Sequence, residues 1–162
     1  MFLKKVCLTS FLVIILLTPN STVFAAISQN LTLPELQSFG FSNYETINAN
    51  SFFYQLKRFS EKLEPIFQKN QTKYKLSIYQ KRFNELVYIA NFRKTGFLDE
   101  TSSRYTTISG EIIQNYKFKD HNFQAKIPKN IMILEKLRDG FEANSVAWIK
   151  LQQVIETTKG LL

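Results

Sequence analysis

Residues that commonly carry out catalysis are scarce in this 162-residue chain. The one histidine, His121, lies in a polar stretch, and a zinc site with two imidazole ligands is excluded. The one cysteine, Cys7, lies in an apolar run near the N-terminus. The sequence contains no glycine-rich phosphate-binding loop. We therefore predict no catalytic residue, no cofactor and no metal site.

Two pairs of neighbouring carboxylates are the remaining candidates for general acid–base chemistry. They are Asp99 with Glu100, and Glu61 with Glu64. Glycoside hydrolysis requires two carboxyl groups with separated pKa values facing one cleft, and neither spacing indicates that arrangement. We interpret Asp99 as a helix cap and the Glu61–Glu64 pair as helix-surface charge, and we predict a non-enzymatic protein.

A charged constellation with informative spacing lies in two consecutive segments. Arg58 and Glu61 are three residues apart, and Arg82 and Glu85 repeat this spacing. In an antiparallel hairpin that turns near residues 70–72, Arg58 falls opposite Glu85, and Glu61 falls opposite Arg82. Two such pairs beside an apolar seam would fix the register of the hairpin more than they would add stability. The alternative is four solvated charges that contribute little.

Four segments with apolar residues at spacings of three and four would position these charges, a pattern typical of amphipathic helices. We predict helices over 51–68, 70–95, from 98 to about 125 (or a shorter helix and a loop), and 128–160. The predicted buried stripes are Phe52, Leu56, Phe59, Leu63 and Ile66; Leu76, Tyr79, Phe83, Leu86 and Ala90; Tyr105, Ile108, Ile112 and Tyr116; and Leu134, Leu137, Phe141, Asn144, Trp148, Leu151 and Ile155.

The helix ends follow from capping and helix-breaking residues. The predicted N-caps are Asn50 or Ser51, Asn70 or Thr72, and Asp99. We expect Pro65 to kink or end the first helix, and Gly96 to end the second in a left-handed conformation. Gly140 lies inside the fourth predicted helix, where a glycine costs about 1 kcal/mol relative to alanine.

The low content of glycine and proline, 5 and 4 residues, favours long helices over a many-stranded sheet. We predict an all-α fold, an antiparallel bundle of about four helices, with one domain over 50–160. Residues 26–49 are polar and lack a helical period, and we predict an extended leader that can form one short turn at 33–36. Its apolar residues would lie on the helices; they are Leu31, Leu33, Leu36, Phe39 and Phe41.

The first 25 residues have the three parts of a secretory signal peptide. Lys4 and Lys5 precede an uncharged apolar stretch over 6–17, and Ala25 offers a small residue before the predicted cleavage site. That stretch is well short of the roughly 20 residues that span a bilayer. We therefore predict export to the periplasm, the cell surface or the medium. The alternative is an uncleaved segment that anchors the protein to the membrane.

A net charge of +8 makes the chain strongly basic, but acidic residues are interleaved with the basic ones. In an exported protein, anionic lipid or an anionic polymer of the envelope is a more accessible partner than nucleic acid. We expect the partner to be another protein or such a polymer, and we expect no nucleic-acid binding.

The segment 51–114 resembles a bacterial family of exported helical domains of unknown function. Two motifs carry the resemblance: Tyr54-Gln55-Leu56-Lys57-Arg58 followed by Glu61, and Arg82-Phe83-Asn84-Glu85-Leu86. The resemblance implies a helical hairpin in which Arg58, Glu61, Arg82 and Glu85 matter to the fold. It implies no activity and no catalytic residue.

From these observations we expect a scaffold or interaction module of the bacterial envelope or of the secreted proteins. The alternative is a helical bundle that holds a small ligand or a lipid between its helices. Such a bundle should enclose an apolar cavity of several hundred cubic ångströms.

Overall fold

The computed structural model describes residues 30–45, 47–49, 51–67, 70–115 and 120–162. Within these ranges the chain forms helices and no strand, which confirms the all-α class. The predicted signal peptide lies outside the described residues, as do Asn50 and Tyr116. Among the described helices, none is long and apolar enough to cross a membrane.

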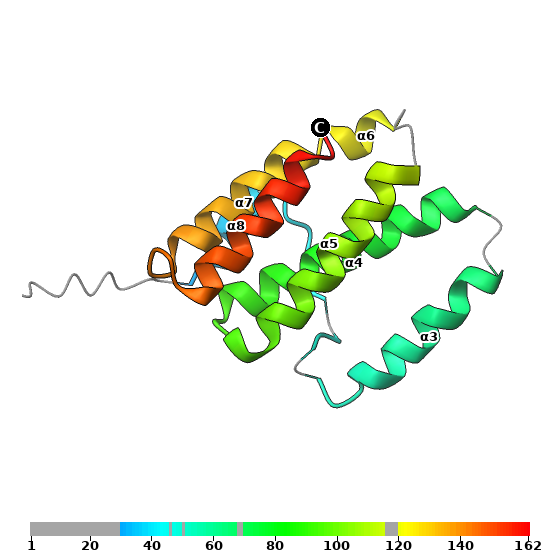
Figure 1. The fold of residues 1–162 in the computed structure, drawn as a ribbon, viewed down its shortest axis with the longest axis horizontal. Helices are drawn as coiled ribbons and strands as arrows, with labels where there is room; N and C mark the ends of the chain where they lie inside the picture. The colour runs from blue at the N-terminus through cyan, green and yellow to red at the C-terminus, as the bar shows by residue number, and fades with distance from the viewer. Residues whose placement is uncertain (1–29, 46, 50, 68–69, 116–119) are drawn as a thin grey trace, which may run out of the picture.

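Four helices form the core: α4 (Gln71–Asn91), α5 (Leu98–Asn115), α7 (Ile127–Asp139) and α8 (Val146–Lys159). Helix α4 packs against α5 and α7, and α8 packs against the same two helices, so the four close a ring (Figure 1). Their inward side chains are buried; the largest are Tyr79, Tyr105, Phe83, Leu86, Ile89, Ile112, Ile127, Ile133, Leu134, Leu151 and Ile155.

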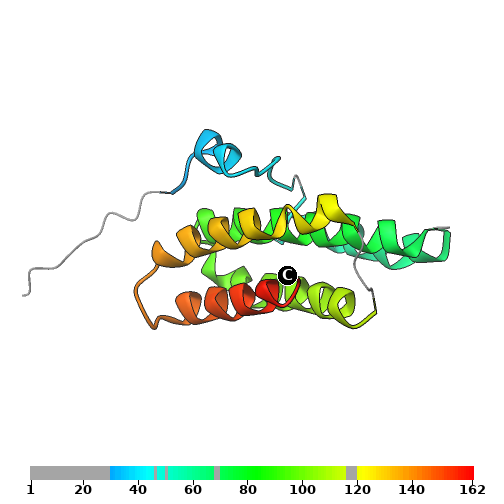
Figure 2. The same cartoon turned by 90° about the horizontal axis from the view of Figure 1, so that it is seen from above.

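The ring consists of two antiparallel hairpins, α4–α5 and α7–α8, that lie side by side (Figure 2). Helices that face each other across the two hairpins run in the same direction. Near its start, α5 contacts the first half of α8 through Asp99 and Lys150, and further along Tyr105 reaches Thr158 near the end of α8. The predicted antiparallel order therefore holds between α4 and α5, but α5 and α8 run in the same direction. Helices α7 and α8 are also antiparallel, although the sequence predicted one helix there. Because α5 and α7 occupy diagonal corners, a simple up-and-down order around the ring does not form.

A row of hydrogen bonds crosses the apolar core and joins all four helices. The amide of Asn130 donates to the Tyr79 hydroxyl at 3.2 Å, and that hydroxyl lies 2.7 Å from the Tyr105 hydroxyl. Tyr105 in turn lies 2.9 Å from the Thr158 hydroxyl, which donates to the backbone oxygen of Val154. Every polar group in the row has a partner, as buried polar groups require.

Helix α4 follows the predicted pattern closely. The Asn70 side chain caps it by accepting a hydrogen bond from the backbone nitrogen of Lys73 at 2.9 Å. The predicted stripe of α4 is buried from Tyr79 to Ala90. The left-handed residue after the helix is Arg93, with φ of 53°, and not Gly96, which lies in the 3₁₀ turn η1 (Thr95–Phe97). The Arg93 side chain is held by the backbone oxygen of Gly140 at 2.5 Å.

Helix α5 differs from the prediction in its cap, because Asp99 is not its N-cap, and its buried stripe agrees. Helix α5 begins at Leu98, so Asp99 lies in the first turn, where it pairs with Lys150. Tyr105, Ile108 and Ile112 are buried as predicted. The helix ends at Asn115, and Asp120 caps a separate short helix, α6 (His121–Gln124), which excludes one continuous helix to 125.

The predicted single helix over 128–160 is wrong. Helix α7 ends at Asp139 with Gly140 as its C-cap, and Asn144 adopts a φ of 64°. Ser145 caps α8 by accepting a hydrogen bond from the Trp148 backbone nitrogen. Apolar spacings of three and four continued across this turn by coincidence. Instead, the chain turns within six residues that contain Gly140, Asn144 in a left-handed conformation, and the N-cap Ser145.

The leader is more ordered than the prediction of an extended segment. Thr32 and Glu35 form a capping box at the start of helix α2 (Leu33–Ser38), and Leu36 and Phe41 are buried against the core. Asn91 at the end of α4 holds this segment through both backbone groups of Leu31 at 2.8 Å. The segment therefore covers the α4–α7 side of the bundle (Figure 2).

Helix α3 (Tyr54–Phe67) contradicts the predicted stripe of the first helix. It begins three residues after Ser51 and continues past Pro65, at the edge of the molecule (Figure 1). Four of the apolar residues that were predicted to be buried, Phe52, Leu56, Phe59 and Leu63, are exposed, and the Ile66 side chain lies outside the described part of the chain. Tyr54 and Glu61 on another face are buried. The predicted helical spacing of the apolar residues in α3 is correct, but it is the polar face of this helix that packs on the bundle.

Candidate docking surface and charge cluster

The outward face of α3 carries an apolar surface that we call the outer row. It begins with Phe52 and Phe53, just before the helix, and continues on it; its members are Phe52, Phe53, Leu56, Phe59 and Leu63. Phe52 is 93% exposed, Leu56 is 67% exposed and Phe59 is 62% exposed. Isolated exposed apolar residues are common, but a contiguous row on one helix face indicates a binding surface.

The inward face of α3 attaches to the body through long polar side chains. Lys57 pairs with Glu45 at 3.0 Å and donates to the backbone oxygen of Ile47 at 2.6 Å. The Tyr74 hydroxyl of α4 donates to the backbone oxygen of Glu61 at 2.8 Å. The Tyr54 ring lies under the guanidinium of Arg104, 4.7 Å from the ring centre, in a cation–π contact.

A charge cluster of four residues joins α3, α4 and α5. Arg82 of α4 bonds to Glu61 of α3, and its other amino group donates to Glu85 at 2.9 Å. On α5, Arg104 bonds to Glu100 and approaches Glu85 to 3.9 Å. Glu61, Arg82, Glu85 and Arg104 therefore form one connected set, with Arg82 and Glu85 nearly inaccessible to solvent.

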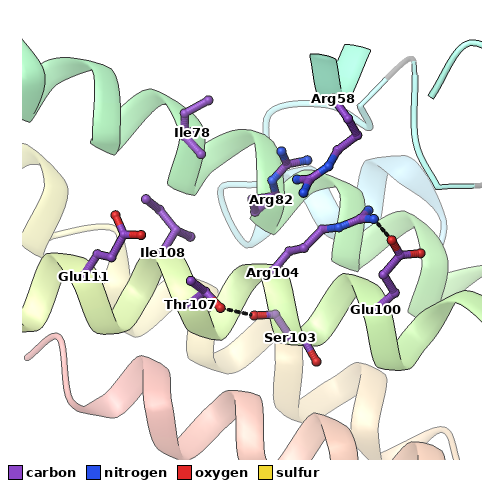
Figure 3. A pocket seen from close by; sticks show the side chains of 9 residues that line it. All are labelled: Arg58, Ile78, Arg82, Glu100, Ser103, Arg104, Thr107, Ile108 and Glu111. Atoms are coloured by element: carbon purple, nitrogen blue, oxygen red, sulfur yellow. Dashed lines mark hydrogen bonds and ion pairs between the residues drawn. The ribbon is translucent and has the colours of Figure 1, made fainter. Parts of the chain in front are cut away.

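The structure brings together three of the four predicted charge residues. Glu61 and Arg82 face each other across the α3–α4 hairpin. The predicted Arg58–Glu85 pair is not present: Glu85 is approached by Arg82 and Arg104, and Arg58 lies above them (Figure 3). Arg104 was absent from the prediction because the sequence does not show that α5 packs beside this hairpin. Its spacing of four residues from Glu100 was the available signal.

The cluster leaves several buried polar atoms without a hydrogen-bond partner. They are the Tyr54 hydroxyl oxygen, one carboxylate oxygen each of Glu61 and Glu85, and Nη1 of Arg104. Burial raises the pKa of the Glu85 carboxyl, and the neighbouring Arg82 only partly offsets that rise. Burial also lowers the pKa of Arg104. Buried polar atoms without hydrogen-bond partners lower the stability of the folded protein. Their presence in this cluster is therefore consistent with a role in binding.

A hollow of about 360 Å³ lies beside the cluster, between α4 and α5 and below Arg58 of α3 (Figure 3). The guanidinium groups of Arg58 and Arg82 lie next to each other at one end, and that of Arg104 lies near them and is directed toward Glu100 (Figure 3). Ile78 and Ile108 form its apolar side. We call it the arginine pocket.

The carboxylates that line the arginine pocket are each held by a cation. Glu100 bonds to Arg104, and Glu111 bonds to Lys75 across α4 and α5. Among the residues that the structure describes, Arg58 forms no hydrogen bond or ion pair. The site therefore presents one guanidinium, that of Arg58, without a partner in the part of the chain that the structure describes.

A second hollow of about 360 Å³ lies at the end of the bundle where α5 and α8 begin. Leu98, Phe141, Val146 and Ala147 form most of its wall, with the Asp99–Lys150 pair at the rim. Its volume is at the lower end of the range for small-molecule pockets.

In the described part of the chain, no three residues of the metal-ligating types His, Cys, Asp and Glu lie close enough to hold an ion. His121 is exposed at the start of α6. Comparison with protein-family models, with curated proteins and with solved structures finds no match to this chain. The resemblance to a bacterial family of exported helical domains therefore stays a prediction.

Proposed function

We propose that the protein is an exported, non-enzymatic interaction module that docks on an anionic lipid surface through the outer row of α3. The exposure of that row carries the proposal. Helix α3 directs its polar face to the bundle and its phenylalanines and leucines outward, which is the arrangement of an amphipathic helix that lies in a membrane interface. Export rests on the signal-like first 25 residues.

Charge supports a lipid surface as the partner. The chain has a net charge of +8, and removal of the predicted signal peptide with Lys4 and Lys5 would leave +6. A basic protein is attracted to anionic headgroups over the range of the Debye length, about 8 Å at physiological salt. The outer row then enters the boundary of the acyl chains. Burying one leucine side chain contributes about 1.5–3 kcal/mol, so a row of five large apolar residues supplies an adequate driving force.

Flotation of the purified protein with lipid vesicles tests this function. We expect binding to vesicles that contain phosphatidylglycerol and little binding to pure phosphatidylcholine. Leu56→Asp should weaken binding by about ten-fold or more, because it removes a buried leucine and adds a charge that anionic lipid repels. Ile149→Asp is the matched control, because Ile149 is also a large apolar residue, is 42% exposed and lies on α8, far from the outer row and outside the hollow where α5 and α8 begin.

Two results would contradict the lipid partner. One is equal vesicle binding by the two variants. The other is a concentration-dependent dimer that Leu56→Asp abolishes while the wild type ignores vesicles, because the outer row would then pair with a second copy of the chain.

The hollow where α5 and α8 begin favours a second candidate function, the binding of a small apolar ligand. Its wall of Leu98, Phe141 and Val146 supports this function, and its volume limits the ligand to a small molecule. A rise in thermal stability on adding a short-chain fatty acid, lost in Ala147→Phe, would support it. Identical shifts in the two proteins would argue against it.

A further inference from the structure

We infer that the arginine pocket is a binding site for a phosphate group, with Arg58 as its principal donor and Arg82 and Arg104 beside it. The inference does not rest on lipid docking by the outer row, because the pocket lies on the opposite, inward face of α3. Three guanidinium groups from three different helices lie near one another there (Figure 3). A guanidinium offers several N–H donors in a planar fork that matches the oxygens of phosphate.

The donors that a ligand would use are identifiable. Arg82 is engaged by Glu61 and Glu85 and forms the floor of the site. Arg104 is paired with Glu100 and approaches Glu85 to 3.9 Å, whereas Arg58 is free of ion pairs within the described chain and is the donor available to a ligand. The exposed Ser103 adds a hydroxyl at the rim.

Electrostatics favours an anion over a cation at this position. Glu100 and Glu111 line the pocket, but Arg104 and Lys75 hold them, so neither is available to a cation. Arg82 and Arg104 are paired with Glu61, Glu85 and Glu100, so Arg58 adds a positive charge that no described carboxylate pairs with, and a bound anion would supply that partner. The position of Arg58 beside Arg82 and Arg104 is therefore most favourable in energy when a bound ligand supplies a negative charge.

The size of the hollow fits a phosphate group that is attached to a larger molecule. Its volume of about 360 Å³ exceeds what a single small ion fills, and Ile78 and Ile108 provide an apolar wall beside the arginines. The same pocket chemistry therefore accepts inorganic phosphate or the phosphate of a lipid headgroup. Separate experiments distinguish these two sources.

Titration of the purified protein with inorganic phosphate, followed by NMR of the arginine side-chain N–H groups, tests the site directly. We expect shifts of the Arg58 and Arg104 signals. Arg58→Gln should weaken binding by about ten- to one-hundred-fold, because one charged hydrogen-bond donor is lost. Arg58→Lys should give an intermediate affinity, because it keeps the charge and loses the fork. The charge-matched control is Lys126→Gln, an exposed lysine between α6 and α7, which should bind as the wild type does.

A second arm measures binding of the same variants to phosphatidylglycerol vesicles. Loss of vesicle binding in Arg58→Gln with an intact outer row identifies the lipid headgroup as the source of the phosphate. Phosphate binding that depends on Arg58, with unchanged vesicle binding, identifies a soluble phosphate.

The inference is overturned if Arg58→Gln and Lys126→Gln behave alike in both arms, since any binding would then reflect net charge alone. Because Arg58 has no partner within the described chain, Arg58→Gln should keep its fold. An unchanged circular dichroism spectrum and melting temperature verify this. Leu56→Asp should retain phosphate binding, so failure of lipid docking and failure of the phosphate site give different results.

Discussion

At the scale of single residues, the protein places two kinds of polar group in its interior. The row from Asn130 through Tyr79 and Tyr105 to Thr158 is fully paired and joins the four core helices. The charge cluster around Glu85 is incompletely paired and lies where α3 meets the bundle. The fully paired row specifies how the four core helices pack, and the incompletely paired charge cluster is available to a ligand.

Glu85 should make the stability of the protein depend on pH. Its carboxyl has a raised pKa, first because of burial; Arg82 and Lys57 oppose the rise, and Glu61 adds to it. The folded state therefore keeps the Glu85 proton at pH values where the unfolded chain has released it. This contribution to stability is present below the ordinary value of 4.5 and is lost as the pH rises through the raised pKa of the folded state.

Urea unfolding of the wild type and of Glu85→Gln from about pH 4 to about pH 8 measures this effect. We expect the free energy of unfolding of the wild type to fall relative to that of the variant as the pH increases. The control is Glu142→Gln, an exposed carboxylate in the α7–α8 turn, which should follow the wild type. A constant difference between wild type and Glu85→Gln across the range would contradict the prediction.

At the scale of elements, α3 and α4 show that one sequence pattern can have two outcomes. Both carry apolar residues at spacings of three and four. In α4 the stripe faces three neighbouring elements and is buried, whereas in α3 the corresponding row is exposed and the polar face is attached to the body. The pattern defines an apolar face, and the packing of the other helices determines whether that face has a partner.

Truncation of one leucine in each helix tests this difference. Leu86→Ala removes a completely buried side chain of α4 and should lower the free energy of unfolding by about 2–5 kcal/mol. Leu56→Ala in the outer row should change it by no more than about 0.5 kcal/mol. Chemical denaturation measures both values, and comparable losses in the two variants would show that the outer row is covered in solution.

At the scale of the whole molecule, two antiparallel hairpins close a core that leaves α3 as an attached outer helix. The capped leader helix α2 covers another side of the ring and is fixed by Asn91. The proposed lipid surface and the proposed phosphate site lie on opposite faces of α3. A single helix at the edge of the bundle would thus carry both binding functions.

Export should leave a defined N-terminus. We expect mass spectrometry of the protein secreted by a bacterial host to find Ala26 as the first residue, because Ala25 provides the small side chain that the cleavage site requires. Ala25→Arg should block the processing and retain the precursor with the cells. Recovery of the wild type with residues 1–25 intact would support the membrane-anchor alternative.

The sequence by itself determined the all-α class, the course of α4, the buried stripe of α5 and the presence of two facing charges, Glu61 and Arg82. These features follow from local periodicity and capping, which act within a few residues. Only the tertiary structure decided that α7 and α8 are separate helices, that Arg104 replaces Arg58 beside Glu85, and that the outer row faces away from the bundle. The last two depend on which helices are neighbours, and short-range spacing carries no information about contacts between residues far apart in the chain. The break between α7 and α8 has local signals in Gly140, Asn144 and Ser145, but the apolar spacing continues across them.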